Sequence, residues 1–375
     1  GLEWQTIVTG SSFTAVAGRA YWVNTTSNAC TITLPSSASA GDELLFVDYS
    51  RTWGTNAVTL NRNGLKIQGG TANAIFGIDG QAINIVYSGS TNGWIPVSDI
   101  TTGNSQAYSI DFLVIAGGGS GGSTFGGGGG GAGGFRTSTQ IAGIGTSITV
   151  TVGAGGTNSY RNPGANGASS AISGTGLTTI TSAGGGGGGE FNTPPGKNGG
   201  SGGGATAGTT NLSAGGDGNT PSTSPVQGFA GGNGVGSNTN AGAGGGGSSS
   251  IGISNSGTTS GNGGNGTANS ITGSSVTYAG GGGGASESGT QGTGQAGGGN
   301  GAAGQGGDAT ANTGSGGGGS ERSGGNYRGG NGGSGVVILS VPTANYSGTS
   351  SGSPTVSTSG ANTIMKFTGS GSYTA

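Results

Sequence analysis

The sequence predicts a mainly β fold with no significant helix: an N-terminal all-β domain, then a glycine-rich helix bundle flanked by short β-strands. Three observations lead to this prediction. Short apolar runs alternate with polar residues in the first 105 positions, no stretch shows the apolar period of an α-helix, and 100 of the 375 residues are glycine. The glycines are concentrated, because 13 precede residue 112 and 5 follow residue 335, which leaves 82 between them.

Residues 1–105 are predicted to form the all-β domain. Cys30, Ile32 and Leu34 alternate with threonines, and residues 81–87 alternate in the same way. Turn-forming residues separate these runs from one another. All four tryptophans of the chain precede residue 95, and we expect them to supply much of the core of this domain.

Residues 106–111 are predicted to link this domain to the glycine-rich region, 112–335. Disorder is one interpretation of that region, since such compositions are typical of flexible linkers. A collagen-like triple helix needs glycine at every third position, and residues 184–200 break that period. A phosphate-binding P-loop is also excluded, because Gly196-Lys197 is followed by asparagine rather than by serine or threonine.

A packed bundle of polyglycine II helices is the remaining interpretation of residues 112–335. Such a helix has three residues per turn, rises by about 3.1 Å per residue and makes no internal hydrogen bonds. Neighbouring helices must therefore satisfy its N–H and C=O groups, and a Cβ atom would hold the helices apart. Strand-like sequences bracket the glycine runs, which favours a packed bundle over a linker. They are residues 112–116, 147–152, 176–183, 275–280 and 335–341.

Residues 336–375 are predicted to be closing strands. Met365 and Phe367 alternate with polar neighbours and are expected to lie in a strand that pairs with residues 336–341.

The loops between the glycine helices are predicted to be the only places in the bundle with chemical variety. The candidate binding residues are Phe125, Tyr160, Arg161, Glu190, Phe191, Phe229, Glu287, Arg322, Tyr327 and Arg328. Their aromatic rings are suited to stacking on sugars or filling protein pockets, and their guanidinium groups to pairing with anions. The alternative is that the rings pack beneath the loops and that the charges keep the surface soluble.

Several function classes are not expected. The formal charge is −2 with no basic stripe, so we expect no nucleic-acid partner. The absence of histidine and the single cysteine leave no expected metal site, cofactor or catalytic residue, and therefore no enzyme. No apolar run approaches the roughly 20 residues that span a bilayer, so membrane insertion is not expected. The chain begins with glycine rather than methionine, which suggests a processed or partial chain.

Particular stretches resemble a known family. Residues 112–139, 148–156, 180–189 and 332–342, together with the closing residues 363–375, are similar to the glycine-rich domain of tail-fibre and adhesin proteins of tailed bacteriophages, marine T4-like phages in particular. The first 50 residues resemble the β-structured module that often precedes that domain. The resemblance covers nearly the whole chain.

The resemblance implies a tail-fibre adhesin on the virion, whose loops between polyglycine II helices bind a host outer-membrane protein or surface glycan. It also implies other tail-fibre subunits as partners and a possible homotrimer. An alternative is a structural subunit of an extracellular filament or biofilm matrix. An ice-binding protein is a third interpretation, but it requires a flat, regular Thr/Ala face, which loops with charged and aromatic residues do not provide.

Overall fold

The computed structural model describes residues 1–101, 108–207, 212–236, 240–321 and 325–375, with the side chains of 98–101 left out. The chain divides into two compact units, Gly1–Ala107 (unit 1) and Tyr108–Ala375 (unit 2). The described residues contain β-strands and one 3₁₀ turn, Thr343–Asn345 (η1), and no α-helix. The prediction of a mainly β fold without significant helix is confirmed for them.

Unit 1 consists of two β-sheets, and the chain alternates between them as far as its sixth strand. One has the order β1-β3-β5-β8-β9 and the other the order β2-β4-β6-β7. The strands are β1 (Glu3–Trp4), β2 (Ser12–Thr14), β3 (Arg19–Val23), β4 (Cys30–Thr33), β5 (Glu43–Asp48), β6 (Val58–Asn61), β7 (Ala74–Phe76), β8 (Gln81–Tyr87) and β9 (Trp94–Thr101). Neighbouring strands up to β6 are parallel, and β7, β8 and β9 pair antiparallel.

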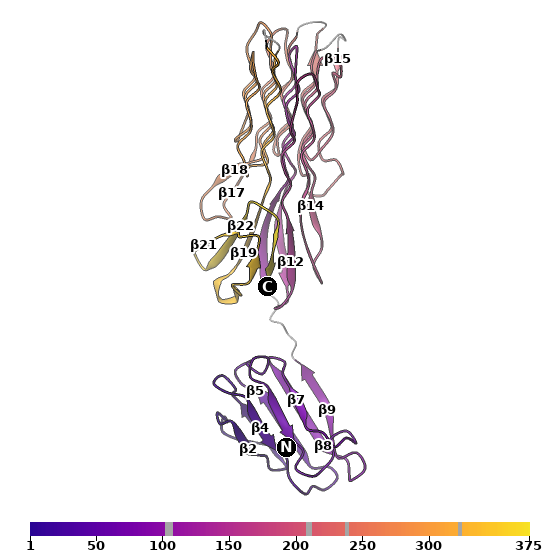
Figure 1. The fold of residues 1–375 in the computed structure, drawn as a ribbon, viewed down its shortest axis with the longest axis vertical. Coiled ribbons are helices and arrows are strands. Elements are labelled where there is room, and N and C mark those ends of the chain that lie inside the picture. Colours follow the sequence, from indigo (N-terminus) through magenta and orange to yellow (C-terminus); the bar gives the residue numbers. More distant parts are fainter. Residues whose placement is uncertain (102–107, 208–211, 237–239, 322–324) are drawn as a thin grey trace. The chain divides into compact units, whose positions relative to one another are not determined.

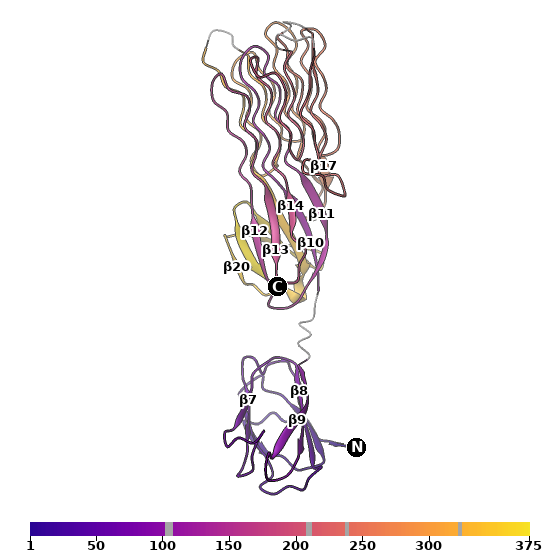
Figure 2. The ribbon, with the colours of Figure 1, turned by 90° about the vertical axis from the view of Figure 1, so that its right-hand side faces the viewer.

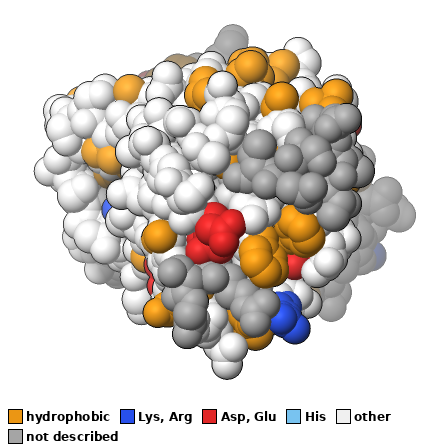
Figure 3. All heavy atoms as spheres, turned by 90° about the horizontal axis from the view of Figure 1, so that it is seen from above, with side chains coloured by type: hydrophobic (Ala, Val, Ile, Leu, Met, Phe, Trp, Pro, Cys, Tyr) orange, Lys and Arg blue, Asp and Glu red, His pale blue; other side chains and the backbone are white. Residues whose placement is uncertain are grey.

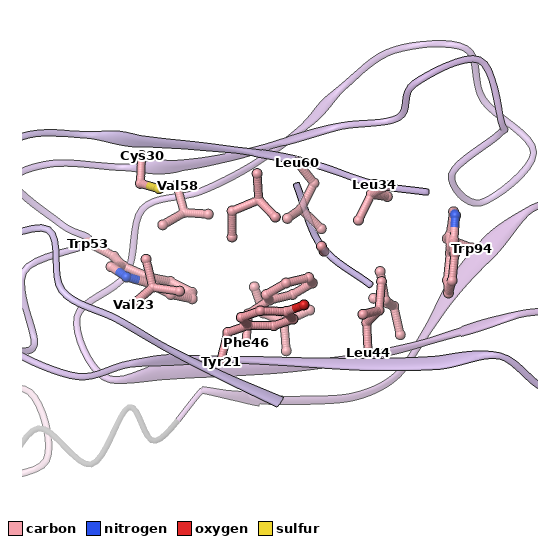
Figure 4. Packing of buried hydrophobic residues seen from close by; sticks show 14 of the residues in the cluster. Tyr21, Val23, Cys30, Leu34, Leu44, Phe46, Trp53, Val58, Leu60 and Trp94 are labelled. Carbon is pink, nitrogen blue, oxygen red and sulfur yellow. The ribbon is translucent and has the colours of Figure 1, made fainter. Parts of the chain in front are cut away.

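The core of unit 1 lies between these sheets (Figure 4). Cys30, Ile32 and Leu34 are all buried there, as their alternation predicts. Only part of the tryptophan prediction holds. Trp53 and Trp94 are fully buried, whereas Trp4 is 48% exposed and stacks on Trp22 at 4.3 Å outside the core. The reason is strand register: Trp4 lies opposite Ala20, and β3 turns Tyr21, not Trp22, toward the core.

Unit 2 has two five-stranded sheets at one end, with the orders β11-β10-β19-β22-β21 and β14-β13-β12-β23-β20. Their strands are β10 (Tyr108–Ile115), β11 (Phe135–Ala142), β12 (Ser147–Thr151), β13 (Ser170–Gly174), β14 (Ile180–Ser182), β19 (Val336–Pro342), β20 (Ser350–Ser351), β21 (Thr355–Ser359), β22 (Asn362–Phe367) and β23 (Gly371–Thr374). β15 (Leu212–Ser213) and β16 (Gly234–Val235), far apart in the sequence, form a two-stranded antiparallel sheet. A short hairpin joins β17 (Thr267–Asn269) to β18 (Val276–Tyr278).

Two predicted boundaries differ from the structure. Residues 108–111 of the expected linker belong to β10, because they pair with β11, while 106–107 lie outside the described residues. The closing strands of 336–375 are not a separate part, because β19 pairs with β10 and β23 pairs with β12. The expected pairing of the Met365 strand with β19 is confirmed.

The glycine-rich segments lie side by side and run away from the sheets (Figures 1 and 2). We call this array the glycine lattice. In segment 127–134, successive N–H groups donate to three other segments in turn and return to each after three residues, over 2.8–3.0 Å. The N–H donors and carbonyl acceptors are Gly127 to Ser320, Gly128 to Gly189, Gly129 to Ala243, Gly130 to Gly317, Gly131 to Gly186 and Ala132 to Gly246. The same segment accepts N–H groups from 119–122, 201–204 and 282–285, so six neighbours surround it.

Close backbone approach explains the demand for glycine in the lattice. An ideal Cβ on Gly130 would lie less than 3.0 Å from backbone atoms of Gly119 and Ser120. Ser120 shows that a small side chain can be tolerated inside when it joins the bonding, since its buried Oγ accepts the N–H of Ala165 at 2.8 Å.

Outer segments of the lattice use side chains as acceptors. Exposed or half-buried asparagines and one aspartate accept backbone N–H groups of adjacent segments through Oδ1, at 2.7–3.3 Å. We call these residues the Asn/Asp acceptors. They are Asn166, Asn198, Asn233, Asn262, Asn300, Asp308 and Asn331. Each supplies a carbonyl-like oxygen where a donor of the lattice faces the outside, so that the N–H is not left unpaired.

Candidate binding site at the loop end of the lattice

The turns that face away from the sheets of unit 2 form what we call the loop end (Figures 1 and 2). Along the sequence, segments that run away from the sheets alternate with segments that run back. Hydrogen bonds between these segments bring their turns together. The N–H of Ser123 donates to Asn162, the hydroxyl of Thr206 donates to the carbonyl of Gly126, and the N–H of Glu287 donates to Asn240. Turns far apart in the sequence thus share one surface, which is mainly uncharged but carries acidic, apolar and basic patches (Figure 3).

An aromatic pair occupies part of the loop end. The rings of Phe125 and Phe191 lie 5.3 Å apart at 56°, a tilted arrangement that aromatic rings favour. Both rings are half-buried. The turn before the first ring is strained, since Thr124 and Phe125 have φ of 64° and 46°. A β-branched residue rarely adopts such angles, and strain of this kind concentrates at functional sites.

A buried carboxylate holds the two turns of the aromatic pair in place. Glu190 is 2% exposed, and its Oε1 accepts the hydroxyl of Thr124 at 2.8 Å and Nδ2–H of Asn192 at 3.1 Å. Its Oε2 accepts the backbone N–H of Asn192 at 2.9 Å. Glu190 is therefore a positioning residue rather than a contact residue. Thr124 and Asn192 belong to this candidate site, and the sequence prediction missed them.

The turn that carries Tyr160 and Arg161 neighbours this pair. Its Asn162 donates its N–H to Oγ of Ser123 at 2.8 Å, next to Thr124. The guanidinium of Arg161 lies 5.4 Å from the centre of the Tyr160 ring, a cation–π contact, and Arg161 is exposed with φ of 58°.

Glu287 belongs to a second, polar group at the loop end. Its carboxylate accepts Nδ2–H of Asn240, and the hydroxyl of the preceding Ser286 donates to the carbonyl of Thr258. Glu287 is exposed, unlike Glu190. The loop end thus combines an aromatic and basic group with an acidic and hydroxyl-rich group.

Comparison with protein families matches the sequence model of the glycine-rich domain to residues 90–342, which include the whole lattice. The chain belongs to the glycine-rich domain family. A search of curated proteins finds no match.

The other predicted residues near 325 that the structure describes belong to neither of these two groups at the loop end. Arg328 is held within the chain, since its Nη1 donates to Oδ1 of Asn331 at 2.8 Å and lies 3.9 Å from Asp308. Tyr327 packs its ring against Gly304. Arg322 lies outside the described residues.

Phe229 is not at the loop end of the glycine-rich domain, contrary to the prediction. It lies two residues after Gln227, whose carbonyl accepts the N–H of Phe135 at the start of β11, so it belongs to the sheet end. The turn formed by 219–227 reverses the chain there, which glycine spacing alone does not reveal.

Among the described residues, no three His, Cys, Asp or Glu side chains cluster as metal ligands would. In the same part of the chain, no helix has the length and apolar character needed to cross a membrane.

Proposed function

We propose that this chain is a receptor-binding adhesin of a phage tail fibre, located on the virion, and that its loop end contacts a protein or glycan on the surface of a host bacterium. The observation that supports this most is the Phe125–Phe191 pair, which is half-buried and fixed by the buried Glu190. Loops on a rigid scaffold are where recognition residues usually lie, and pre-ordered loops reduce the entropy cost of binding.

The scaffold in this proposal is a polyglycine II bundle. The three-residue repeat of hydrogen-bond partners in segment 127–134 matches three residues per turn, whereas partners in a β-sheet alternate with period two. Such a bundle gives the loops fixed positions without an apolar core beneath them. Other tail-fibre subunits, and a trimer of this chain, are the partners expected on the virion.

The test is binding of the fluorescently labelled chain to a panel of bacterial strains. Phe191→Ser is expected to reduce saturable binding by about tenfold or more, because aromatic anchors dominate such contacts. Phe229→Ser is the matched control, since it removes the same side chain, 37% exposed, from the sheet end. Equal losses in both variants would contradict a site at the loop end.

The alternative is a subunit of an extracellular filament. If no strain binds the chain while filaments form as its concentration rises, the adhesin proposal fails and the filament is favoured. Electron microscopy and light scattering over a concentration series distinguish the two outcomes.

A further inference from the structure

A cavity in unit 2 lies away from the loop end, between the β17–β18 hairpin and strands β21 and β22. Its volume is about 360 Å³. That lies within the range of small-molecule sites and far exceeds the roughly 30 Å³ share of one liquid water. The hairpin closes over the sheet at its turn, where Gly273 lies against Ser359. Figure 1 shows the hairpin beside these strands.

The lining of the cavity combines one cation with several hydroxyl groups. Lys366 and Ile364 lie on β22, directly opposite Thr355 and Ser357 of β21, so the four side chains share one face. Tyr278 of β18 completes the wall from the hairpin side. No aspartate or glutamate lines the cavity, so its only formal charge among the described residues is positive.

Four polar side chains of this lining have no hydrogen-bond or ion-pair partner in the described part of the chain: those of Lys366, Tyr278, Thr355 and Ser357. The side chains of Thr272, Asn312 and Thr313, which also line it, bond to residues nearby. The ion pairs found there are Arg19–Glu3 and Arg328–Asp308, neither of which involves Lys366. Tyr278 is only 3% exposed, yet no hydrogen bond between described residues engages its hydroxyl. Burial raises the pKa of Tyr278, so its hydroxyl stays protonated and can donate at neutral pH. The Tyr278 hydroxyl is not one of the fully buried polar atoms left without a partner, so it is open to the cavity and can bond to a ligand there.

We propose that this cavity binds a carboxylate-bearing sugar residue. The ammonium of Lys366 pairs with the carboxylate, and the hydroxyls of Tyr278, Thr355 and Ser357 bond to sugar hydroxyls. The apolar wall of Ile364 and the tyrosine ring lies against the C–H face of the sugar. A simple anion would use the cation but would leave most of the hydroxyls and most of the volume unused.

The test is saturation-transfer difference NMR on the whole chain with three probes: galacturonate, galactose and acetate. Galacturonate is expected to bind at least about tenfold more tightly than either of the others, since an ionic hydrogen bond adds roughly that factor. Lys366→Gln is expected to remove this advantage, and Tyr278→Phe to weaken galacturonate while preserving the packing of the ring. Lys197→Gln, which changes an exposed lysine outside the cavity, is the matched control.

Two outcomes would overturn the proposal. Acetate binding as tightly as galacturonate would mean that the cavity holds only a generic anion. Unchanged galacturonate binding in Lys366→Gln would place the sugar elsewhere. Phe191→Ser is carried alongside and is expected to retain galacturonate binding, so failure of the cavity and failure of the loop-end site are distinguishable.

Discussion

At the scale of single residues, the glycine lattice distinguishes sharply between positions that look alike in the sequence. Gly130 sits where a Cβ would enter the backbone of a neighbouring segment, whereas Gly369 has open space around the same atom and no positive φ. The difference arises from packing, not from conformational preference.

Gly130→Ala is therefore expected to lower the free energy of unfolding of unit 2 by about 2–3 kcal/mol, the cost of overpacking an interior. Gly369→Ala is expected to stay within about 0.5 kcal/mol of the parent, as surface substitutions do. Urea denaturation followed by circular dichroism measures both. Similar losses in the two variants would contradict close packing around residue 130.

Glu190 allows a second prediction at this scale. Glu190→Ala leaves the hydroxyl of Thr124 and the N–H of Asn192 without acceptors, which costs about 1–3 kcal/mol where the groups are buried. We expect the two turns to loosen while the sheets persist. Hydrogen exchange should show lost protection confined to the turns near 125 and 191, with Glu287→Ala, an exposed carboxylate, as the control that changes little.

At the scale of elements, inner and outer segments of the lattice differ in where their backbone N–H groups find acceptors. An interior segment such as 127–134 has neighbours on all sides, but an outer segment has donors without a facing carbonyl. The Asn/Asp acceptors supply oxygen there, which explains why G-x-[N/D]-G recurs, as at 164–167, 196–199, 215–218, 231–234, 298–301 and 329–332. The stretch 215–218 differs from the other five. The backbone N–H of Asp217 donates to Asn198, and its carboxylate accepts Nδ2–H of Asn198 at 3.4 Å rather than a backbone N–H.

Asn166→Ala tests this role. It removes the acceptor of the buried Gly187 N–H, bonded at 3.0 Å, and is expected to destabilise unit 2 by about 1–2 kcal/mol. Asn326→Ala, an exposed asparagine in the described part of a turn, should have almost no effect. Denaturation midpoints of the two variants give the comparison; a larger shift for Asn326→Ala would contradict the proposed acceptor role.

The sequence predicts features that depend on neighbouring residues, and it does not reveal those that depend on contacts between residues far apart in the chain. Alternation in 81–87 is local and correctly indicates a strand with one buried face. The glycine runs indicate backbone packing. Which segments bond to one another, however, depends on where along the lattice each turn reverses the chain, and the sequence does not show this. Phe229 was misplaced for that reason, and the role of Glu190 was hidden because its partner Thr124 is 66 residues away.

At the scale of the whole molecule, the two units rest on different cores. All four tryptophans and the single cysteine lie in unit 1, so their signals report on that unit alone. Unit 2 instead has the pair Tyr108 and Tyr373, whose hydroxyls lie 3.0 Å apart in the apolar cluster between its sheets.

Alkaline pH should affect unit 2 through this pair. Burial, and then the hydrogen bond with Tyr373, raise the pKa of Tyr108 above its ordinary value near 10. A group whose folded-state pKa is raised contributes stability that is intact below the unfolded value and is lost above it. The free energy of unfolding of unit 2, followed by circular dichroism, should therefore hold to about pH 10 and then fall, more gently in Tyr108→Phe; a flat profile would contradict this.

The same lattice has a thermal consequence. The interior of the lattice buries mostly peptide groups. The heat capacity of unfolding is about 12–15 cal/mol/K per residue in ordinary proteins; exposure of hydrocarbon raises it, and exposure of polar groups lowers it. Unit 2 should therefore fall below that value in scanning calorimetry and show a flatter stability curve than unit 1. Such a curve keeps a protein folded in cold water, where proteins built on hydrocarbon cores begin to weaken.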